Sequence, residues 1–247
     1  MRTDVQVLLA ILAIALISMP VYALGPARTA RDPYEIADRG SFILGSFIRG
    51  WFYWFIRPFE RIALALGLGP LLFNLFGVAF GVAGGVAFAT GHTVLGGWGV
   101  LLGGVADILD GRLARALGVA SRRGAFLDST LDRFAEFGAF VGLAFLFRSS
   151  ALGLVLVVTA LGGSLLVSYA RARGESVGVV CKLGVMQRAE RLLLLGFGAL
   201  LDAPVSAAMG RGPGSLLFVL VGLIALGTVG TAVFRTVWIA RRLPARD

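Results

Sequence analysis

Composition places this chain of 247 residues in a membrane. Hydrophobic residues make up 57% of it and charged residues only 15%, and the mean hydropathy is +0.87, whereas soluble domains carry about 25% charged residues. The net charge of +9 comes from 22 arginines and one lysine against 14 acids. These values exclude a soluble globular protein, and in a membrane chain the basic excess favours cytoplasmic loops and anionic lipid headgroups over nucleic acid as a partner. Cys181 and His92 are each alone, which excludes an intramolecular disulfide and a zinc site of the Cys/His type.

Apolar runs predict an all-α, polytopic membrane protein. Each run has about 20 residues, the length that crosses about 30 Å of hydrocarbon. The runs cover residues 5–24, 71–90, 93–111, 124–147, 151–170, 188–207 and 214–240. The last six predict a six-helix transmembrane core, and the first predicts an additional N-terminal hydrophobic helix. We therefore expect an N-terminal hydrophobic segment (1–24), a juxtamembrane segment (25–66) and a transmembrane domain (67–242).

The first run has two interpretations. The letters "VYA", which end at Ala23, have the small-residue character of a signal-peptide cleavage site. The run is long for a signal core, however, and the "MRTD" before it is barely basic. We expect a retained membrane anchor.

Residues 41–67, "SFILGSFIRGWFYWFIRPFERIALALG", mix aromatic residues with spaced arginines. Charge interrupts this stretch too often for a membrane span. Aromatic and basic residues together are typical of an amphipathic helix that lies along the membrane interface. In the chain as a whole, the 35 glycines predict close packing of helices in lipid.

The distribution of arginines predicts the orientation. Basic segments hold Arg28, Arg31, Arg39, Arg49, Arg57 and Arg61, then Arg112, Arg115, Arg122 and Arg123, then Arg171, Arg173, Lys182, Arg188 and Arg191. They alternate with "TGHTV", "FRSSA" and "DAPVSAAMGRGPGS". By the positive-inside rule we expect the basic segments in the cytoplasm, which predicts an integral protein of a bacterial-type inner or plasma membrane.

Acidic residues between two of the apolar runs predict a site. Asp107 and Asp110 are three residues apart, so on a helix they share a face; Asp128, Asp132 and Glu136 repeat every four residues and share another. The intervening "ALGVASRRG" predicts a short turn that brings the two faces together. Clustered carboxylates without His or Cys favour magnesium, manganese or calcium. We predict a site for one or two divalent cations that faces the cytoplasm. The alternative is a solvated network with Arg112, Arg115, Arg122, Arg123 and Arg133.

The acids belong to a longer pattern, D-x2-D-G-x2-A-R-x8-G-x3-D-x3-D, which begins at Asp107 and ends at Asp132. This pattern resembles the signature of the CDP-alcohol phosphatidyltransferase family, with every fixed position filled. The resemblance implies a phospholipid-synthesis enzyme that moves a phosphatidyl group from CDP-diacylglycerol to an alcohol and releases CMP, with Mg²⁺ or Mn²⁺ as cofactor. It implies Asp107, Asp110, Asp128 and Asp132 as metal ligands, and Asp132 also as the general base. It further implies contacts to the CDP group by Gly111, Ala114 and Arg115.

Cations follow in "SYARARGESVGVVCKLGVMQRAERL", residues 168–192. So many cations on the side of the aspartates suit a phosphorylated, anionic acceptor; the alternative is a loop that is basic for topological reasons alone. "SYARAR", "QRAER" and the intramembrane Arg235 resemble the phosphatidylinositol phosphate synthase branch of the family, which implies inositol phosphate as the acceptor. The acceptor-binding residues implied are Ser168, Arg171, Arg173, Arg188, Arg191 and Arg235.

Other functions remain alternatives at this point. Within the family, glycerol 3-phosphate is the main competing acceptor. An intramembrane prenyltransferase would be expected to carry two separate Asp-rich motifs, and a divalent-cation transporter would spread its acids through several spans. The partners we expect are CDP-diacylglycerol, a phosphorylated alcohol, the lipid bilayer and a second copy of the chain.

Overall fold

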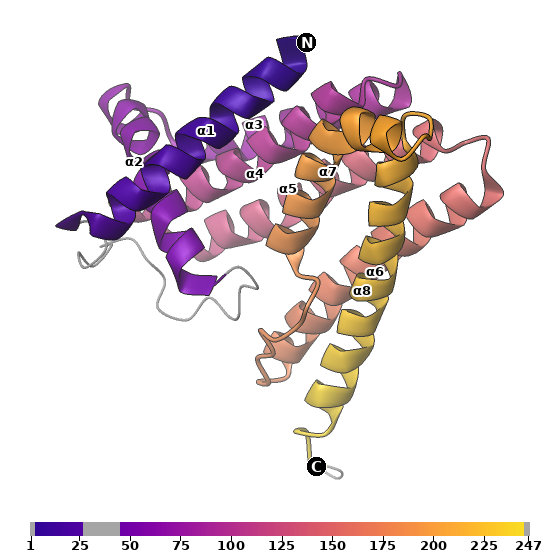
Figure 1. Cartoon of the computed structure of the whole chain (residues 1–247). Helices are drawn as coiled ribbons and strands as arrows, with labels where there is room; N and C mark the ends of the chain where they lie inside the picture. Colours follow the sequence, from indigo (N-terminus) through magenta and orange to yellow (C-terminus); the bar gives the residue numbers. More distant parts are fainter. Residues whose placement is uncertain (1–2, 27–44, 245–247) are drawn as a thin grey trace.

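The computed structural model describes residues 3–26 and 45–244, and within these ranges the chain forms helices and no strands. The helices are α1 (Thr3–Leu24), α2 (Gly45–Ala65), α3 (Pro70–Ala89), α4 (Thr93–Ala116), α5 (Arg122–Leu146), α6 (Ala151–Ser176), α7 (Arg188–Ala208) and α8 (Ser215–Ala240) (Figure 1). The predicted all-α class is confirmed. The cytoplasmic placement predicted for Arg28, Arg31 and Arg39 concerns residues outside the described ranges.

The core that was predicted as six helices consists of α3 to α8. Five of these, α3, α4, α6, α7 and α8, are long and apolar enough to cross a membrane. The sixth, α5, has 25 residues but carries Asp128, Asp132, Arg133 and Glu136 in the first two thirds of its length, so its composition alone does not mark it as a span. In α1, the stretch Ala13–Leu24 is a short apolar helix.

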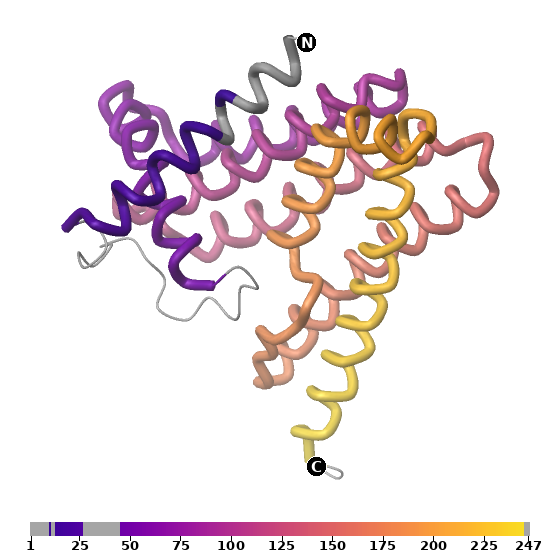
Figure 2. Tube along the Cα trace, viewed as in Figure 1, coloured from indigo at the N-terminus to yellow at the C-terminus, as the bar shows by residue number. Residues whose placement is uncertain are grey.

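The helices pack in two groups that α7 connects. Helix α3 lies along both α4 and α5, and α6 lies along α8 (Figures 1 and 2). Helix α7 contacts α4 on one side and α8 on the other. Helices α1 and α2 pack against each other beside the first group, where α2 also contacts α4. The two helices that carry the acidic residues, α4 and α5, touch each other little.

Glycines allow the helices of the first group to approach closely. A methyl group on Gly99 of α4 would lie 2.6 Å from the Cα atom of Gly84 on α3, and a methyl group on Gly81 of α3 would lie 2.6 Å from the carbonyl oxygen of Ala135 on α5. Gly85 and Gly142 meet backbone to backbone between α3 and α5. Side chains larger than hydrogen do not fit at these crossings, which agrees with the close packing predicted from glycine content.

The predicted interfacial helix corresponds to α2. It is amphipathic: Trp51, Tyr53, Ile56 and Glu60 are buried, whereas Arg61 is exposed. Tyr53, Ile56 and Glu60 follow a helical spacing of three and four, so they lie on one face, whereas Trp51 contacts Ser18 of α1. That face packs toward the transmembrane helices.

An internal cap fixes α7 against α8. Asp202 on α7 accepts hydrogen bonds from the backbone N–H groups of Gly214 (2.6 Å) and Leu217 (3.2 Å), at the start of α8. The hydroxyl of Ser206 donates to the same carboxylate (3.2 Å) and accepts from the N–H of Leu216 (3.2 Å). A buried carboxylate at a helix N-terminus satisfies N–H groups that have no partner within the helix.

Candidate active site and metal centre

A five-residue turn brings the acidic parts of α4 and α5 together. Helix α4 ends at Ala116, and Gly118 takes a left-handed conformation (φ +68°). The hydroxyl of Ser121 then accepts a hydrogen bond from the N–H of Gly124 (3.1 Å) and begins α5. Serine is a preferred residue at this position because its oxygen satisfies an N–H group of the first turn. The turn was predicted from sequence, but the capping role of Ser121 was not.

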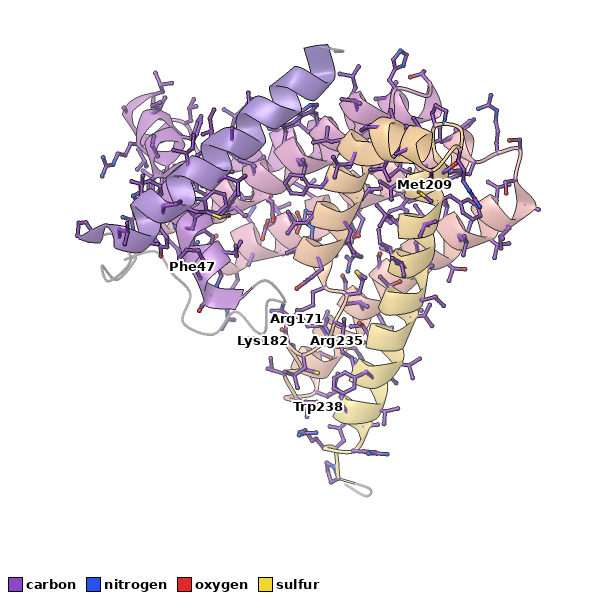
Figure 3. All side chains as sticks on the ribbon, in the orientation of Figure 1. Phe47, Arg171, Lys182, Met209, Arg235 and Trp238 are labelled. Carbon is purple, nitrogen blue, oxygen red and sulfur yellow. The ribbon has the colours of Figure 1, made fainter. Side chains whose placement is uncertain are left out.

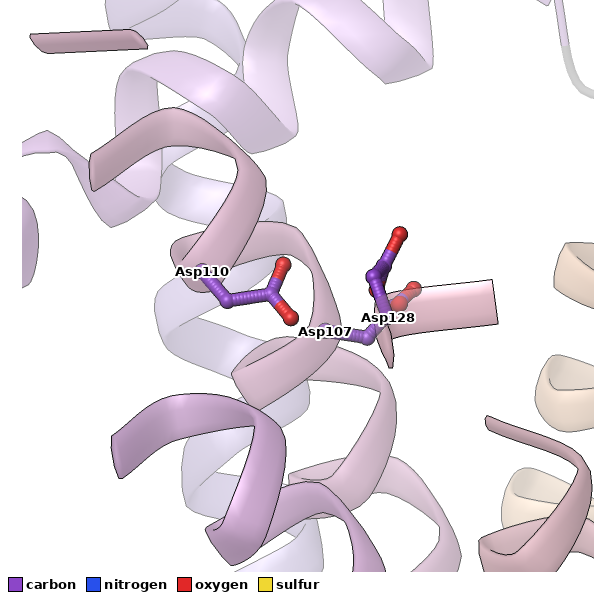
Figure 4. A group of neighbouring side chains, drawn as sticks. All are labelled: Asp107, Asp110 and Asp128. Carbon is purple, nitrogen blue, oxygen red and sulfur yellow. The ribbon is translucent and has the colours of Figure 1, made fainter. Parts of the chain in front are cut away.

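Three carboxylates converge beside this turn. Asp107 and Asp110 come from α4 and Asp128 from α5, and one oxygen from each lies within 4.8 Å of the others (Figure 4). Asp110 is only 2% exposed, and neither of its oxygens has a hydrogen-bond partner among the described residues. Three close carboxylates repel one another unless a cation neutralises them. The arrangement therefore fits a divalent cation with hard oxygen ligands.

Arg188 closes one side of this group. Its Nη1 atom lies 2.6 Å from Oδ2 of Asp107, and its Nη2 atom lies 2.6 Å from Oδ1 of Asp132. Asp132 is thus joined to the cluster through the guanidinium of Arg188. A second arginine, Arg133, lies 3.6 Å from Oδ2 of Asp132. The first residue of α7 therefore bridges the two acid-bearing helices.

The alternative for these acids was a solvated network with nearby arginines. Arg112 does not take part in such a network. The Nε–H group of Arg112 donates a hydrogen bond to Oε2 of Glu60 on α2 (2.6 Å). Arg115 instead lies over Gly111, where a methyl group would come within 3.3 Å of its Nη1 atom. The glycine of the motif therefore leaves room for this guanidinium. Ala114, also implied in binding the CDP group, is partly buried on the same helix.

The arginines expected to bind the acceptor come from three helices, α6, α7 and α8. Arg191 is buried and forms a two-point pair with Glu136 on α5, from Nε to Oε1 (2.7 Å) and from Nη2 to Oε2 (3.1 Å). Its Nη1 atom donates to the carbonyl of Met186 (3.3 Å). A small cavity between α3, α4, α5 and α7 is lined by Glu136, Arg188 and Arg191. Two of the predicted arginines thus lie at one cavity next to the carboxylates.

Arg171 and Arg235 lie toward the end of the molecule where both α6 and α8 end (Figure 3). Buried Arg235 donates to the carbonyls of Leu183 (2.8 Å) and Val167 (2.9 Å) and to the side chain of Gln187 (3.2 Å). Arg171, one turn after Val167, is exposed and pairs with Glu175 (2.8 Å).

Two other predicted acceptor residues belong to the same part of α6. Arg173 is exposed and contacts Ser176 (3.3 Å), and Ser168 is half-buried. The predicted acceptor residues of α6 and α8 are therefore near each other, and Arg235 reaches the start of α7 through Gln187, the residue before Arg188.

Sequence reasoning missed Glu60 as a partner of Arg112 and Glu136 as a partner of Arg191. Glu136 was expected to share the face of Asp132, and both carboxylates do pair with arginines of α7. Glu60 is an isolated acid on an otherwise apolar face of α2, and Glu136 is the last acid of its face before an apolar stretch; a buried carboxylate in such a place requires a cation nearby. The sequence therefore predicts that each acid has a cationic partner, but it does not identify which residue that partner is.

The fold and the site define a polytopic membrane protein with a carboxylate cluster suited to a divalent cation. The model of the CDP-alcohol phosphatidyltransferase family matches residues 68–228. The phosphatidylinositol phosphate synthase of Streptomyces avermitilis is 34% identical over 217 residues, which cover 84% of this chain and 87% of that protein. The archaetidylinositol phosphate synthase of Methanothermobacter thermautotrophicus is 35% identical over 146 residues, 59% of this chain and 73% of that protein.

Solved structures give the same result. The crystal structure of Mycobacterium tuberculosis phosphatidylinositol phosphate synthase with CDP-DAG bound is 32% identical, with a TM-score of 0.66, and covers 77% of this chain and 96% of that one. The same enzyme in complex with manganese and citrate gives a TM-score of 0.67 at 31% identity, over 77% of this chain and 91% of that one. This chain belongs to the CDP-alcohol phosphatidyltransferase family and is an integral-membrane enzyme of phospholipid synthesis. Family membership does not favour the prenyltransferase or cation-transporter alternatives.

Proposed function

We propose that this enzyme transfers the phosphatidyl group of CDP-diacylglycerol to inositol phosphate and releases CMP. The observation that carries the choice of acceptor is the likeness, over 84% of the chain, to a phosphatidylinositol phosphate synthase. The chain is also similar to an archaetidylinositol phosphate synthase, whose name indicates the same kind of acceptor and a different lipid. This similarity supports inositol phosphate as the acceptor.

The proposed cofactor is Mg²⁺ or Mn²⁺, as one or two ions. Asp107, Asp110 and Asp128 would hold it, and Asp132 would complete the site. The partnerless buried oxygens of Asp110 support this assignment, and a related enzyme has been crystallised with manganese. When bound, such a cation would neutralise the pyrophosphate charge that develops as CMP leaves.

The reaction is a displacement at the phosphatidyl phosphorus. The hydroxyl oxygen of the acceptor forms a new bond to this phosphorus, the bond from phosphorus to the CMP oxygen breaks, and Asp132 takes the hydroxyl proton. Gly111, Ala114 and Arg115 would hold the CDP group, with the guanidinium of Arg115 suited to phosphate oxygens.

The acceptor's phosphate would be bound by arginines, because a guanidinium fork matches phosphate oxygens in charge and geometry. The candidates are Ser168, Arg171, Arg173, Arg188, Arg191 and Arg235. Arg188 and Arg191 support this role by lining the cavity beside the carboxylates. Arg171 supports it by its exposure, because its exposed pair with Glu175 is easily exchanged for a phosphate.

The site would face the cytoplasm of a bacterial cell. Helix α4 ends and α5 begins on the same side of the membrane as the end of α6 and the start of α7. These helix ends, with the connections between them, carry many basic residues, as the positive-inside rule requires on the cytoplasmic side: Arg112, Arg115, Arg122, Arg123, Arg171, Arg173, Lys182, Arg188 and Arg191. The connections on the opposite side carry two arginines, Arg148 and Arg211, and no lysine. We also propose that the enzyme works as a homodimer, since two-fold dimers are the commonest form of homo-oligomer.

Release of CMP by the purified full-length protein tests the proposal. The protein would be supplied with CDP-diacylglycerol, Mg²⁺ or Mn²⁺, and in turn inositol phosphate, glycerol 3-phosphate, inositol and serine. We expect the fastest release with inositol phosphate and none after chelation of the metal. Faster release with glycerol 3-phosphate would assign the enzyme to phosphatidylglycerophosphate synthesis, and preference for inositol or serine would refute a phosphorylated acceptor.

The Arg171→Ala variant tests the acceptor site. Loss of a charge-assisted hydrogen bond of about 1.5–3 kcal/mol should raise the KM for inositol phosphate roughly tenfold or more and leave the KM for CDP-diacylglycerol little changed. Arg148→Ala, which removes an exposed arginine at the opposite end of α5, is the matched control. Equal weakening of both substrates by Arg171→Ala would remove Arg171 from the acceptor site.

A further inference from the structure

Helix α2 precedes the part of the chain that matches the family model, residues 68–228, yet it packs on the helix that carries Asp107 and Asp110. Tyr53 and Ile56 of α2 form a buried cluster with Leu109 of α4. These contacts place α2 directly against the catalytic motif, although α2 contributes no residue to it.

A buried ion pair joins the same two helices. Oε2 of Glu60 lies 2.6 Å from Nε of Arg112, and the two side chains are 5% and 2% exposed. The guanidinium carbon of Arg112 also lies 5.2 Å from the centre of the Tyr53 ring. A cation that is removed from water needs such partners, because an uncompensated buried charge is strongly unfavourable. Glu60 and Tyr53 of α2 thus compensate the buried charge of Arg112.

The ion pair lies on the side of α4 opposite Asp110. With 3.6 residues per turn, Arg112 is about 200° around α4 from Asp110, whereas it is within about 60° of Leu109. Leu109 and Arg112 thus face α2, and Asp107 and Asp110 face α5 and α7, as their contacts with Asp128 and Arg188 require. Movement of α2 would be transmitted to the carboxylates through one turn of a rigid helix.

Helix α1 in turn holds α2. The indole N–H of Trp51 donates to the hydroxyl of Ser18 (3.0 Å), and the ring of Tyr22 packs on Phe47 and Trp54, with centroids 5.6 and 5.8 Å away. The N-terminal helices therefore form a continuous series of contacts, from α1 through α2 to the back of α4.

We propose that α2 is a brace for the metal-bearing helix and that Glu60 is a positioning residue, which holds Arg112 and thereby sets the placement of Asp107 and Asp110. The inference rests on the proposed metal-dependent transfer. It assigns a role in catalysis to a segment outside the matched family region.

The experiment compares full-length wild type with Glu60→Gln, with the charge-swapped Glu60→Arg/Arg112→Glu pair, and with Arg61→Gln as control. Arg61 is the exposed neighbour of Glu60 on α2, so its removal changes charge but not the brace. Three quantities are measured: kcat for CMP release, the KM for CDP-diacylglycerol, and the dissociation constant for Mn²⁺ from the electron paramagnetic resonance signal of free Mn²⁺.

We expect Glu60→Gln to lower kcat roughly tenfold or more, because misplacement of catalytic groups by about 1 Å can cost about 100-fold. We also expect it to weaken Mn²⁺ binding and to change the KM for CDP-diacylglycerol less than kcat. The swapped pair should recover most of both losses, and Arg61→Gln should match wild type. Wild-type kcat and Mn²⁺ affinity in folded Glu60→Gln would overturn the proposal.

A purely structural role is tested by a second variant. If Glu60→Gln fails to fold, Glu60→Met/Arg112→Met removes both charges and is expected to fold, since apolar replacement of a buried pair is often neutral. Normal kcat and Mn²⁺ affinity in this double variant would also overturn the proposal. If wild type itself releases no CMP, the proposed function fails, and the Mn²⁺ measurements still decide whether α2 positions the carboxylates.

Discussion

Removal of the Glu136 carboxylate should destabilise the fold by a predictable amount. Glu136 and Arg191 join α5 to α7 through two bonds of 2.7 and 3.1 Å, and their side chains are 4% and 2% exposed. In Glu136→Ala the guanidinium would stay buried without its counter-ion. Loss of one partner of a buried pair costs about 3–5 kcal/mol. Because each kcal/mol lowers the unfolding midpoint of a chain of this size by about 2–4 °C, we expect a fall of about 6–20 °C.

The midpoint can be measured by heating the detergent-solubilised protein and recording the monodisperse fraction by size-exclusion chromatography. Glu136→Leu/Arg191→Met, which removes both charges, should recover most of the loss. Glu175→Ala is the matched control because the Glu175–Arg171 pair is 42% and 47% exposed, and exposed pairs contribute only about 0–1 kcal/mol. A midpoint of Glu136→Ala no lower than that of Glu175→Ala would refute the reasoning and would leave Arg191 free to act chiefly on substrate.

Three further variants test the site and the fold. Asp110→Asn should abolish CMP release while the protein still inserts, because an amide cannot neutralise a cation; activity within a few-fold of wild type would remove Asp110 from the ligand set. Asp132→Asn should lower kcat by orders of magnitude with little change in CDP-diacylglycerol binding, measured by titration, if Asp132 takes the proton; equal losses would leave it a ligand only. Asp202→Ala should lower the unfolding midpoint, since two buried N–H groups of α8 lose their acceptor at about 1–3 kcal/mol each; an unchanged midpoint would contradict this role.

Much of the fold followed from the hydrophobic pattern, because a helix in lipid must satisfy its own backbone and so appears as a long apolar run. The helix ends were less accurate. The runs predicted ends at 111 and 170, whereas α4 continues to Ala116 and α6 to Ser176. The end of an apolar run marks where the chain leaves the lipid. The helix can continue beyond that point, because its backbone hydrogen bonds do not depend on whether the side chains are apolar or charged.

The carboxylate cluster was predictable for a similar reason. Spacings of three and four fix which side chains share a helix face, so Asp107, Asp110 and Asp128 could be brought together from sequence, and the structure does so. Partners across helices could not be predicted, because spacing within one helix says nothing about its rotation against another. The pairing of Arg188 with Asp107 and Asp132, and of Arg191 with Glu136, depends on how α7 is turned.

The glycine crossings of α3 have a consequence for which cation the site accepts. Helices α4 and α5 divide the proposed ligands between them, and each packs mainly on α3 and only slightly on the other. The distance between α4 and α5 at the site therefore depends on α3, which contributes no ligand. One contact that sets it is the close approach of Gly81 on α3 to the backbone of Ala135, three residues after Asp132. Mg²⁺ requires oxygen ligands at about 2.0–2.1 Å and Ca²⁺ at about 2.3–2.6 Å. A larger side chain at Gly81 would push α3 and α5 apart, and a shift of a few tenths of an ångström matches the difference between these two ions. We therefore expect substitution at Gly81 to change the ion preference of the proposed site, although Gly81 contributes no ligand.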